Sequence, residues 1–128
     1  MSDIAKQVHD KFKVFVGALA PDQTLGSLAD EVAAFASERR VAAKSIGVEY
    51  LEALDRVVVT LGYNEGEEHY PIRLHCVPMG KVDVLGKDFA AMEAAMGAAS
   101  AQRKNIICHE LYLTGSGDFY MVFMTHEE

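Results

Sequence analysis

The residue types that could carry chemistry in this sequence are its two cysteines and five histidines, together with nearby acidic residues. Most of them fall in three stretches, His75-Cys76, Cys108-His109-Glu110 and His126. If the strands that contain these stretches are neighbours, one sheet face would present thiolate, carboxylate and imidazole, which are ligands of divalent metals. We therefore consider a candidate ligand or metal site made of Cys108, Glu110, His126 and His75.

The spacing of these residues favours a structural explanation for most of them. Neighbouring residues on a strand point to opposite faces, so neither His75-Cys76 nor Cys108-His109 can chelate a metal alone. No CxxC or HExxH spacing occurs in the sequence. A nucleophilic Cys108 would need His126 or His75 as its base, because His109 points the wrong way. Buried apolar cysteines and a hydrogen-bonded histidine explain the same residues, and we predict no catalytic residue and no cofactor.

Three other polar groups have a plainer explanation than a binding site. The acidic run at 65–68 lies in a predicted turn, where we expect it to be solvated. Gly115-Ser116-Gly117 connects two strands and lacks the lysine of a phosphate-binding loop. Arg73 and His75, with His69 nearby, could bind a small anion or a peptide, but scattered surface polarity explains them as well.

The elements that must position these residues are clearest at the C-terminal end. Residues 105–114 and 119–126 are rich in β-branched and aromatic side chains and flank the Gly-Ser-Gly turn, which predicts a hairpin. Pairing Leu113 with Phe119 puts an almost wholly apolar set on one face, which should be the core. The opposite face is mixed, so we expect a partner chain, a ligand or another layer of the same chain to cover half of it. Its residues include Tyr112, Tyr120, Val122 and Met124.

Hydrophobic periodicity predicts six further elements before this hairpin. They are helices 3–19 and 27–43, strands 45–54, 56–63 and 69–77, and helix 88–103. The prediction of the first helix is based on apolar residues at helical spacing, namely Ile4, Val8, Phe12, Phe15 and Leu19. The order α-α-β-β-β-α-β-β predicts an α+β domain in which helices pack on one antiparallel five-stranded sheet.

This order of elements is similar to that of the small acidic secretion chaperones. The resemblance is one of layout over most of the chain, and it carries no functional residue across. The chain lacks the C-terminal helix of that pattern. Members of the family are dimeric α+β domains that bind unfolded segments of a partner protein, so the resemblance implies a protein-binding dimer.

Length and charge limit the classes of function. At 128 residues the chain fits a single domain, 1–128. Twelve basic against nineteen acidic residues give a net charge of −7, which disfavours binding to nucleic acid or to an anionic membrane. The start lacks the features of a signal peptide, and no stretch approaches the roughly eighteen apolar residues of a membrane span. We therefore expect a cytoplasmic protein with reduced cysteines.

Together these patterns predict a non-catalytic protein-interaction module, a homodimer that binds a segment of a partner protein. The predicted interface is the mixed hairpin face with Tyr112, Tyr120, Val122 and Met124. The alternative is a small-ligand or metal-dependent enzyme that uses Cys108, Glu110 and His126.

Overall fold

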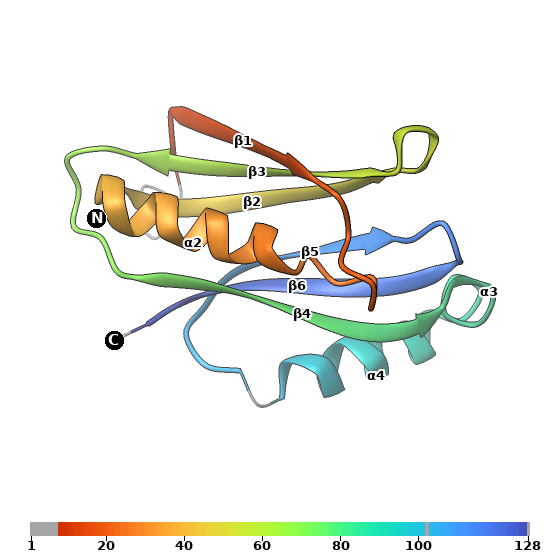
Figure 1. Cartoon of the computed structure of the whole chain (residues 1–128). Coiled ribbons are helices and arrows are strands. Elements are labelled where there is room, and N and C mark those ends of the chain that lie inside the picture. Colours follow the sequence, from red (N-terminus) through yellow and green to blue (C-terminus); the bar gives the residue numbers. More distant parts are fainter. Residues whose placement is uncertain (1–7, 102, 128) are drawn as a thin grey trace.

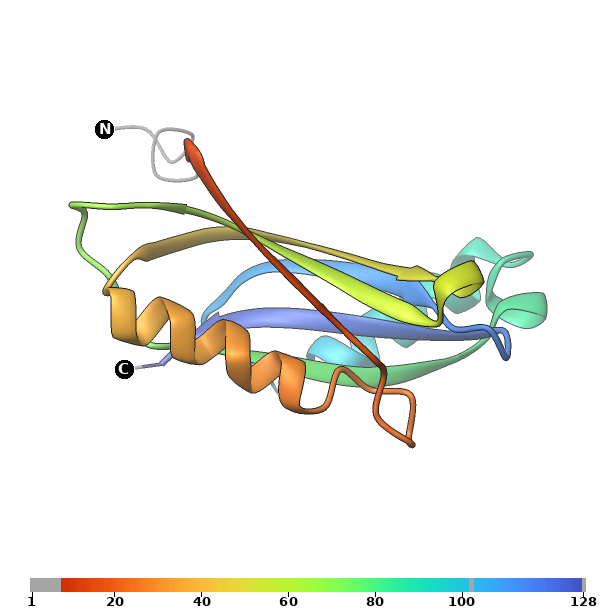
Figure 2. The same ribbon diagram turned by 45° about the horizontal axis from the view of Figure 1, so that its top comes forward.

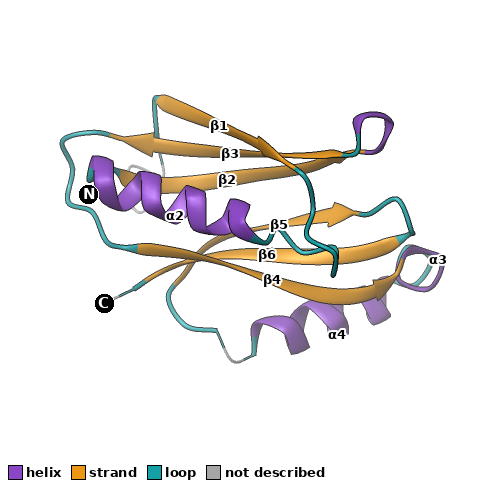
Figure 3. Ribbon diagram, viewed as in Figure 1, coloured by secondary structure: helices purple, strands orange, loops and turns teal. Residues whose placement is uncertain are grey.

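The computed structural model describes residues 8–101 and 103–127. Within these ranges the chain forms six strands and three α-helices, coloured by type in Figure 3. In chain order they are β1 Lys11–Gly17, α2 Ser27–Arg39, β2 Ala42–Leu51, β3 Arg56–Asn64, β4 Ile72–Lys81, α3 Val82–Leu85, α4 Phe89–Ser100, β5 Ile106–Leu113 and β6 Asp118–His126. A short 3-10 turn, Glu52–Leu54, joins β2 to β3.

The strands form two three-stranded antiparallel sheets, ordered β1-β3-β2 and β4-β6-β5. The prediction of one five-stranded sheet is therefore wrong. β2 and β5 lie side by side where the sheets meet (Figure 1), but within the described chain no backbone ladder joins them. We call this line of contact between β2 and β5 the seam. Periodicity indicates which residues form a strand but not which strand they pair with, so it could not show this division.

The sixth strand comes from the stretch whose periodicity predicts the first helix, 3–19. Residues 11–17 form β1, which pairs with β3, and residues 3–7 lie outside the described chain. The same apolar residues fit a helical spacing and an alternating one, and β-branched and aromatic residues favour the extended form beside a partner strand. Phe15 then packs edge-on against Phe35 of α2, with ring centroids 5.8 Å apart. The structure therefore does not have the order of elements that resembles the secretion chaperones.

Helix α2 fills the space between the sheets on the side away from the seam. It packs against β4 of one sheet and β1 of the other (Figure 2). Its buried Leu28 and Val32 confirm the predicted apolar stripe and join the core formed by the inward faces of both sheets. The helix ends at Arg39 rather than at residue 43, because Arg40 adopts the left-handed conformation, with φ 54°, and β2 follows at once.

The C-terminal hairpin has the predicted register, with Leu113 opposite Phe119. A bulge at Ile107 shifts the far end of the pairing. Ile106 therefore lies opposite Thr125 and not opposite His126, as the simple register requires. On its other side, His126 lies opposite Ile72 of β4.

The second sheet is covered on one face and partly covered on the other. The mixed face, with Tyr112, Tyr120, Val122 and Met124, belongs to the core shared with α2 and the first sheet. The main core therefore lies on the mixed face and not, as predicted, on the apolar face of the hairpin. On the other face Met121 and Phe123 are buried too, on the side where α3 and α4 pack against β4 (Figure 2). Of the three coverings considered for the mixed face, the structure supplies another layer of the same chain.

Candidate functional site

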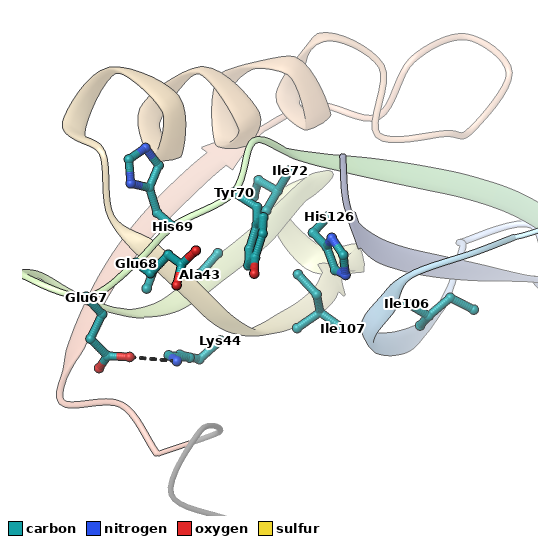
Figure 4. A pocket seen from close by; sticks show the side chains of 11 residues that line it. Ala43, Lys44, Glu67, Glu68, His69, Tyr70, Ile72, Ile106, Ile107 and His126 are labelled. Atoms are coloured by element: carbon teal, nitrogen blue, oxygen red, sulfur yellow. Dashed lines mark ion pairs between the residues drawn. The ribbon is translucent and has the colours of Figure 1, made fainter. Parts of the chain in front are cut away.

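A cavity of about 600 Å³ opens at the end of the seam where β2 and β5 begin (Figure 4). The β3–β4 loop, the first residue of β4 and the last residue of β6 complete its wall. The lining residues are Ala42, Ala43, Lys44, Glu67, Glu68, His69, Tyr70, Ile72, Ile106, Ile107 and His126. We call it the seam cavity. Small-molecule sites typically have volumes of about 300–1,000 Å³, and the seam cavity falls in that range.

Two β-bulges shape this end of the seam. Lys44 drops out of the pairing of β2 with β3, and Ile107 drops out of the pairing of β5 with β6. Both residues line the seam cavity. A bulge re-aims a side chain, twists its strand and often lies beside a functional site. The two strands that border the seam are thus irregular at the end where the cavity opens.

The polar side of the seam cavity comes from the loop 65–71. This loop carries the chain from the first sheet to the second and therefore crosses the end of the seam (Figure 1). Asn64 supports its start, because Asn64 Nδ2 donates to Glu67 Oε2 at 2.7 Å. The backbone N–H of Glu127 supports its end by donating to the Pro71 carbonyl at 2.7 Å. Both ends of the loop are thus held by neighbouring strands or strand ends.

His126 and Tyr70 form the aromatic part of the wall. Their ring centroids are 4.8 Å apart, with planes inclined by 36°. The Nδ1 atom of His126 is buried and has no hydrogen-bond partner in the structure as described. Tyr70 is exposed, and Figure 4 shows its ring beside the imidazole. An unsatisfied buried polar atom costs about 1–3 kcal/mol, so this arrangement is unfavourable for the fold alone.

The charges in the cavity wall are unevenly balanced. Lys44 Nζ lies 2.9 Å from Glu67 Oε1, and hydrogen bonds from Lys44 and Asn64 lower the pKa of Glu67. The neighbouring Glu68 takes part in none of the ion pairs found within the described residues. Figure 4 shows its carboxylate turned to the side of the cavity where Tyr70 lies. Lys44 and Glu67 neutralise each other, which leaves Glu68 as the uncompensated carboxylate of the wall.

The remaining wall is apolar, made by Ala42, Ala43, Ile72, Ile106 and Ile107. Such a lining with a few polar groups on one side is typical of a site that holds a small organic molecule. The arrangement offers a stacking surface, a carboxylate and an imidazole within one cavity. These groups can orient a ligand, and they contain no cysteine or serine nucleophile.

The structure does not bring the four predicted ligand residues into one site. His126 lines the seam cavity, whereas His75 Nε2 lies 3.1 Å from Thr125 Oγ1 on the other face of the sheet. Cys108 packs against the core, and its burial, with a smaller effect from the charge of Glu110, raises its pKa to about 11. Within residues 8–101 and 103–127, no three His, Cys, Asp or Glu residues are placed to hold a metal ion.

The residues predicted as an interface instead hold two parts of the chain together. Tyr112 and Tyr120 stack with ring centroids 5.4 Å apart. The Tyr112 hydroxyl donates to the Gln23 carbonyl at 2.7 Å, and the Tyr120 hydroxyl donates to the Asp22 carbonyl at 2.8 Å. The loop between β1 and α2 is thereby fixed to the second sheet. Together with Val122 and Met124, these tyrosines are covered by the chain itself and are not part of its exposed surface.

Sequence reasoning missed most of the seam cavity. It assigned the acidic run at 65–68 to a solvated turn and gave Lys44 and Tyr70 no role. The available signal was the Glu67–Tyr70 stretch, in which two acids, an imidazole and a phenol stand before an apolar strand. That signal gains meaning only once the loop is known to connect two different sheets.

Comparison of the chain with protein-family models, curated proteins and solved structures found no match. In the part of the chain that the structure describes, no helix is both long and apolar enough to cross a membrane. The function must therefore be argued from the geometry of the seam cavity and the exposed surfaces.

Proposed function

We propose that this domain binds a small organic molecule in the seam cavity. The observation that carries the proposal is the buried His126 Nδ1, which has no partner in the described structure and lies beside Tyr70 in the cavity wall. Few buried polar groups in natural proteins lack a partner, and each such group asks for an explanation. A ligand that displaces the exposed Tyr70 ring would reach the imidazole and supply the missing hydrogen bond.

The lining favours a ligand that has a flat apolar body and a positively charged group. The isoleucine and alanine side chains provide the apolar contact, and Tyr70 provides a ring face for stacking or for a cation. Glu68 provides a carboxylate that Lys44 does not neutralise, since Lys44 pairs with Glu67. An aryl-alkyl amine has this combination of groups, whereas an aryl carboxylate would meet Glu68 as a like charge.

Binding, rather than turnover, is the activity that these groups support. An enzyme based on Cys108 would need a thiolate beside a base, but burial raises the Cys108 pKa to about 11. The thiol is then protonated at neutral pH. His126 lies in the wall of the seam cavity on another strand, whereas Cys108 packs against the core. The alternative of an enzyme using Cys108, Glu110 and His126 therefore has less support than a binding domain.

The test is a binding comparison between matched amines and acids. Benzylamine and phenethylamine, with benzoate and phenylacetate as counterparts, would be titrated into isotopically labelled protein while amide shifts are followed. We expect the amines to shift resonances of 42–44, 67–70 and 106–107, and the acids to shift them much less. Glu68→Gln should weaken amine binding on the order of tenfold, because it removes one charged contact.

Two controls separate a specific site from surface attraction. Glu65→Gln removes an exposed carboxylate from the same loop but outside the cavity wall, so amine binding should not change. Ala43→Leu fills the cavity and should abolish binding while the fold is retained. Amine shifts that persist in Ala43→Leu, or that fall equally in both glutamate variants, would refute the proposal.

A further inference from the structure

The imidazole of His126 limits which polar group a ligand must present. Its buried Nδ1 atom has no hydrogen-bond partner within the described chain. A neutral imidazole has one donor and one acceptor nitrogen, so Nδ1 needs an acceptor in one tautomer and a donor in the other. A hydroxyl group fills both roles, because its oxygen accepts and its hydrogen donates. A hydroxyl therefore satisfies Nδ1 in either tautomer.

Tyr70 indicates what kind of body fits beside this nitrogen. Its phenol ring lies against the imidazole, with ring centroids 4.8 Å apart and planes inclined by 36°. The side chain is 48% exposed, so it has room to turn toward solvent. A ligand ring that takes its place keeps the contact with the imidazole and stays within the apolar wall to which Ile72 and Ile107 belong (Figure 4). A single aromatic ring is thus the body that this position already holds.

Glu68 supplies a second polar contact at the other side of this ring. In the view of Figure 4, the Tyr70 ring stands between the Glu68 carboxylate and the His126 imidazole. Lys44 pairs with Glu67, and Glu68 takes part in none of the ion pairs found among the described residues. A ring in this place would therefore meet an uncompensated carboxylate at one end and an unsatisfied imidazole nitrogen at the other.

We propose that the ligand of the seam cavity is a hydroxyaryl-alkyl amine, with its ammonium group and its hydroxyl at opposite ends of one aromatic ring. The inference rests on the proposed binding of aryl-alkyl amines and adds the hydroxyl to it. The hydroxyl bonds to Nδ1 of His126, the ring takes the place of the Tyr70 ring, and the ammonium pairs with Glu68. 4-Hydroxyphenethylamine carries these groups and serves as the probe.

Other groups at the hydroxyl position satisfy the imidazole less well. An ether oxygen accepts a hydrogen bond but cannot donate one, so it serves one tautomer only. A methyl group serves neither tautomer and leaves Nδ1 of His126 buried without a partner. One neutral hydrogen bond corresponds to about fivefold in affinity, which a titration can measure.

The experiment compares 4-hydroxyphenethylamine with 4-methylphenethylamine, in which a methyl group of similar size replaces the hydroxyl. Both are titrated into the full chain, labelled with nitrogen-15 in the backbone and in the histidine rings. Both should shift the amides of 42–44, 67–70 and 106–107, and the hydroxyl compound should bind about fivefold more tightly. The hydroxyl compound alone should also shift the Nδ1 resonance of His126, which is assigned by its loss in His126→Phe.

Two controls separate the contacts at the two ends of the ring. Glu68→Gln should weaken both compounds on the order of tenfold and leave the ratio between them unchanged, because the hydroxyl contact lies at the other end. 3-Hydroxyphenethylamine is an isomer of the probe with the hydroxyl displaced along the ring. It should bind no more tightly than the methyl compound.

The outcomes distinguish this inference from the proposed function. Equal affinities for the hydroxyl and methyl compounds, or an unchanged His126 Nδ1 resonance, would overturn the hydroxyl contact, while the amide shifts would still support amine binding. A 3-hydroxy isomer that binds as tightly as the probe would overturn the placement of the two groups at opposite ends. If neither compound shifts the amides of the cavity wall, the proposed function itself fails.

Discussion

The two sheets of this protein have the same construction but differ in what covers them. Each has a central strand between two antiparallel neighbours. In the second sheet, Phe123 is 1% exposed although it faces away from α2, whereas Phe12 on the outer face of the first sheet is 67% exposed. The centre of the second sheet is therefore buried on both faces, although Leu113 at its edge is 41% exposed, whereas the outer face of β1 lies in solvent. The difference indicates that a truncation in the centre of the second sheet should cost more stability than one on the outer face of β1.

The largest expected effect tests this difference with one type of substitution at two places. Phe123→Ala should destabilise the fold by about 3–5 kcal/mol, because it leaves a cavity in a packed layer. Phe12→Ala should change the free energy of unfolding by no more than about 0.5 kcal/mol at low protein concentration. Urea unfolding followed by circular dichroism measures both. Equal losses would mean that the outer face of the first sheet is covered as well.

A pH effect should arise at the seam, where the two sheets meet. Burial raises the pKa of Cys108 from its ordinary 9.0 to about 11, so the folded state holds this proton more tightly than the unfolded state. Its contribution is complete below pH 9 and is lost as pH rises from about 9 to about 11. The loss should be roughly 2–3 kcal/mol.

The measurement for Cys108 is the difference in unfolding free energy between wild type and Cys108→Ala, taken from pH 8 to pH 11. This difference removes the contributions of other groups that titrate in the same range. We expect the unfolding free energy of the wild type to fall relative to that of Cys108→Ala as pH rises. A difference that is independent of pH would show that solvent reaches the thiol through the seam.

A smaller effect should follow from the tyrosines that tie the β1–α2 loop to the second sheet. Tyr112→Phe removes the hydrogen bond to the Gln23 carbonyl and should cost about 1–1.5 kcal/mol. Tyr50→Phe is the matched control, since the Tyr50 hydroxyl bonds to Asp55 in an exposed position on the first sheet. The control should cost less, as measured by thermal or urea unfolding. A larger loss in Tyr50→Phe would contradict the view that the second sheet is the more tightly held.

The smallest expected effect concerns the two histidines of the second sheet. His126→Phe removes the unsatisfied nitrogen and should be neutral or stabilise the fold by up to about 1 kcal/mol, while it abolishes amine binding. His75→Phe breaks a contact with Thr125 and should be mildly destabilising without affecting the amine. Thermal unfolding and the amine titration distinguish the two. A clearly destabilised His126→Phe would show that Nδ1 is satisfied in solution.

Much of the local structure could be predicted from the sequence, because local signals determine it. The glycine-rich turn and the alternating residues around it fixed the pairing of Leu113 with Phe119, which the structure confirms. The apolar stripe of α2 was likewise visible in Leu28 and Val32. Both features depend on residues close together in the chain.

What could not be predicted depends on contacts between distant segments. β1 is a strand because β3 lies beside it, although its apolar residues also fit a helix. The seam cavity depends on the bulges at Lys44 and Ile107, and no residue pattern in the sequence predicts these bulges. The prediction that another layer, a ligand or a partner covers the mixed face of the hairpin was correct in that this face is covered. Periodicity could not show that α2 and the first sheet cover it.

The seam also has a mechanical consequence. Side-chain packing holds β2 to β5, whereas backbone hydrogen bonds hold every other neighbouring pair of strands within the two sheets. Separating β2 from β5 breaks side-chain contacts but no ladder of backbone hydrogen bonds, so it needs fewer interactions to be broken than separating two paired strands. The molecule should therefore be most compliant across this line, and amide groups facing it should exchange with solvent sooner than those of β3 or β6. A small molecule could enter by separating β2 from β5 at the seam, while the backbone hydrogen bonds within both sheets stay intact.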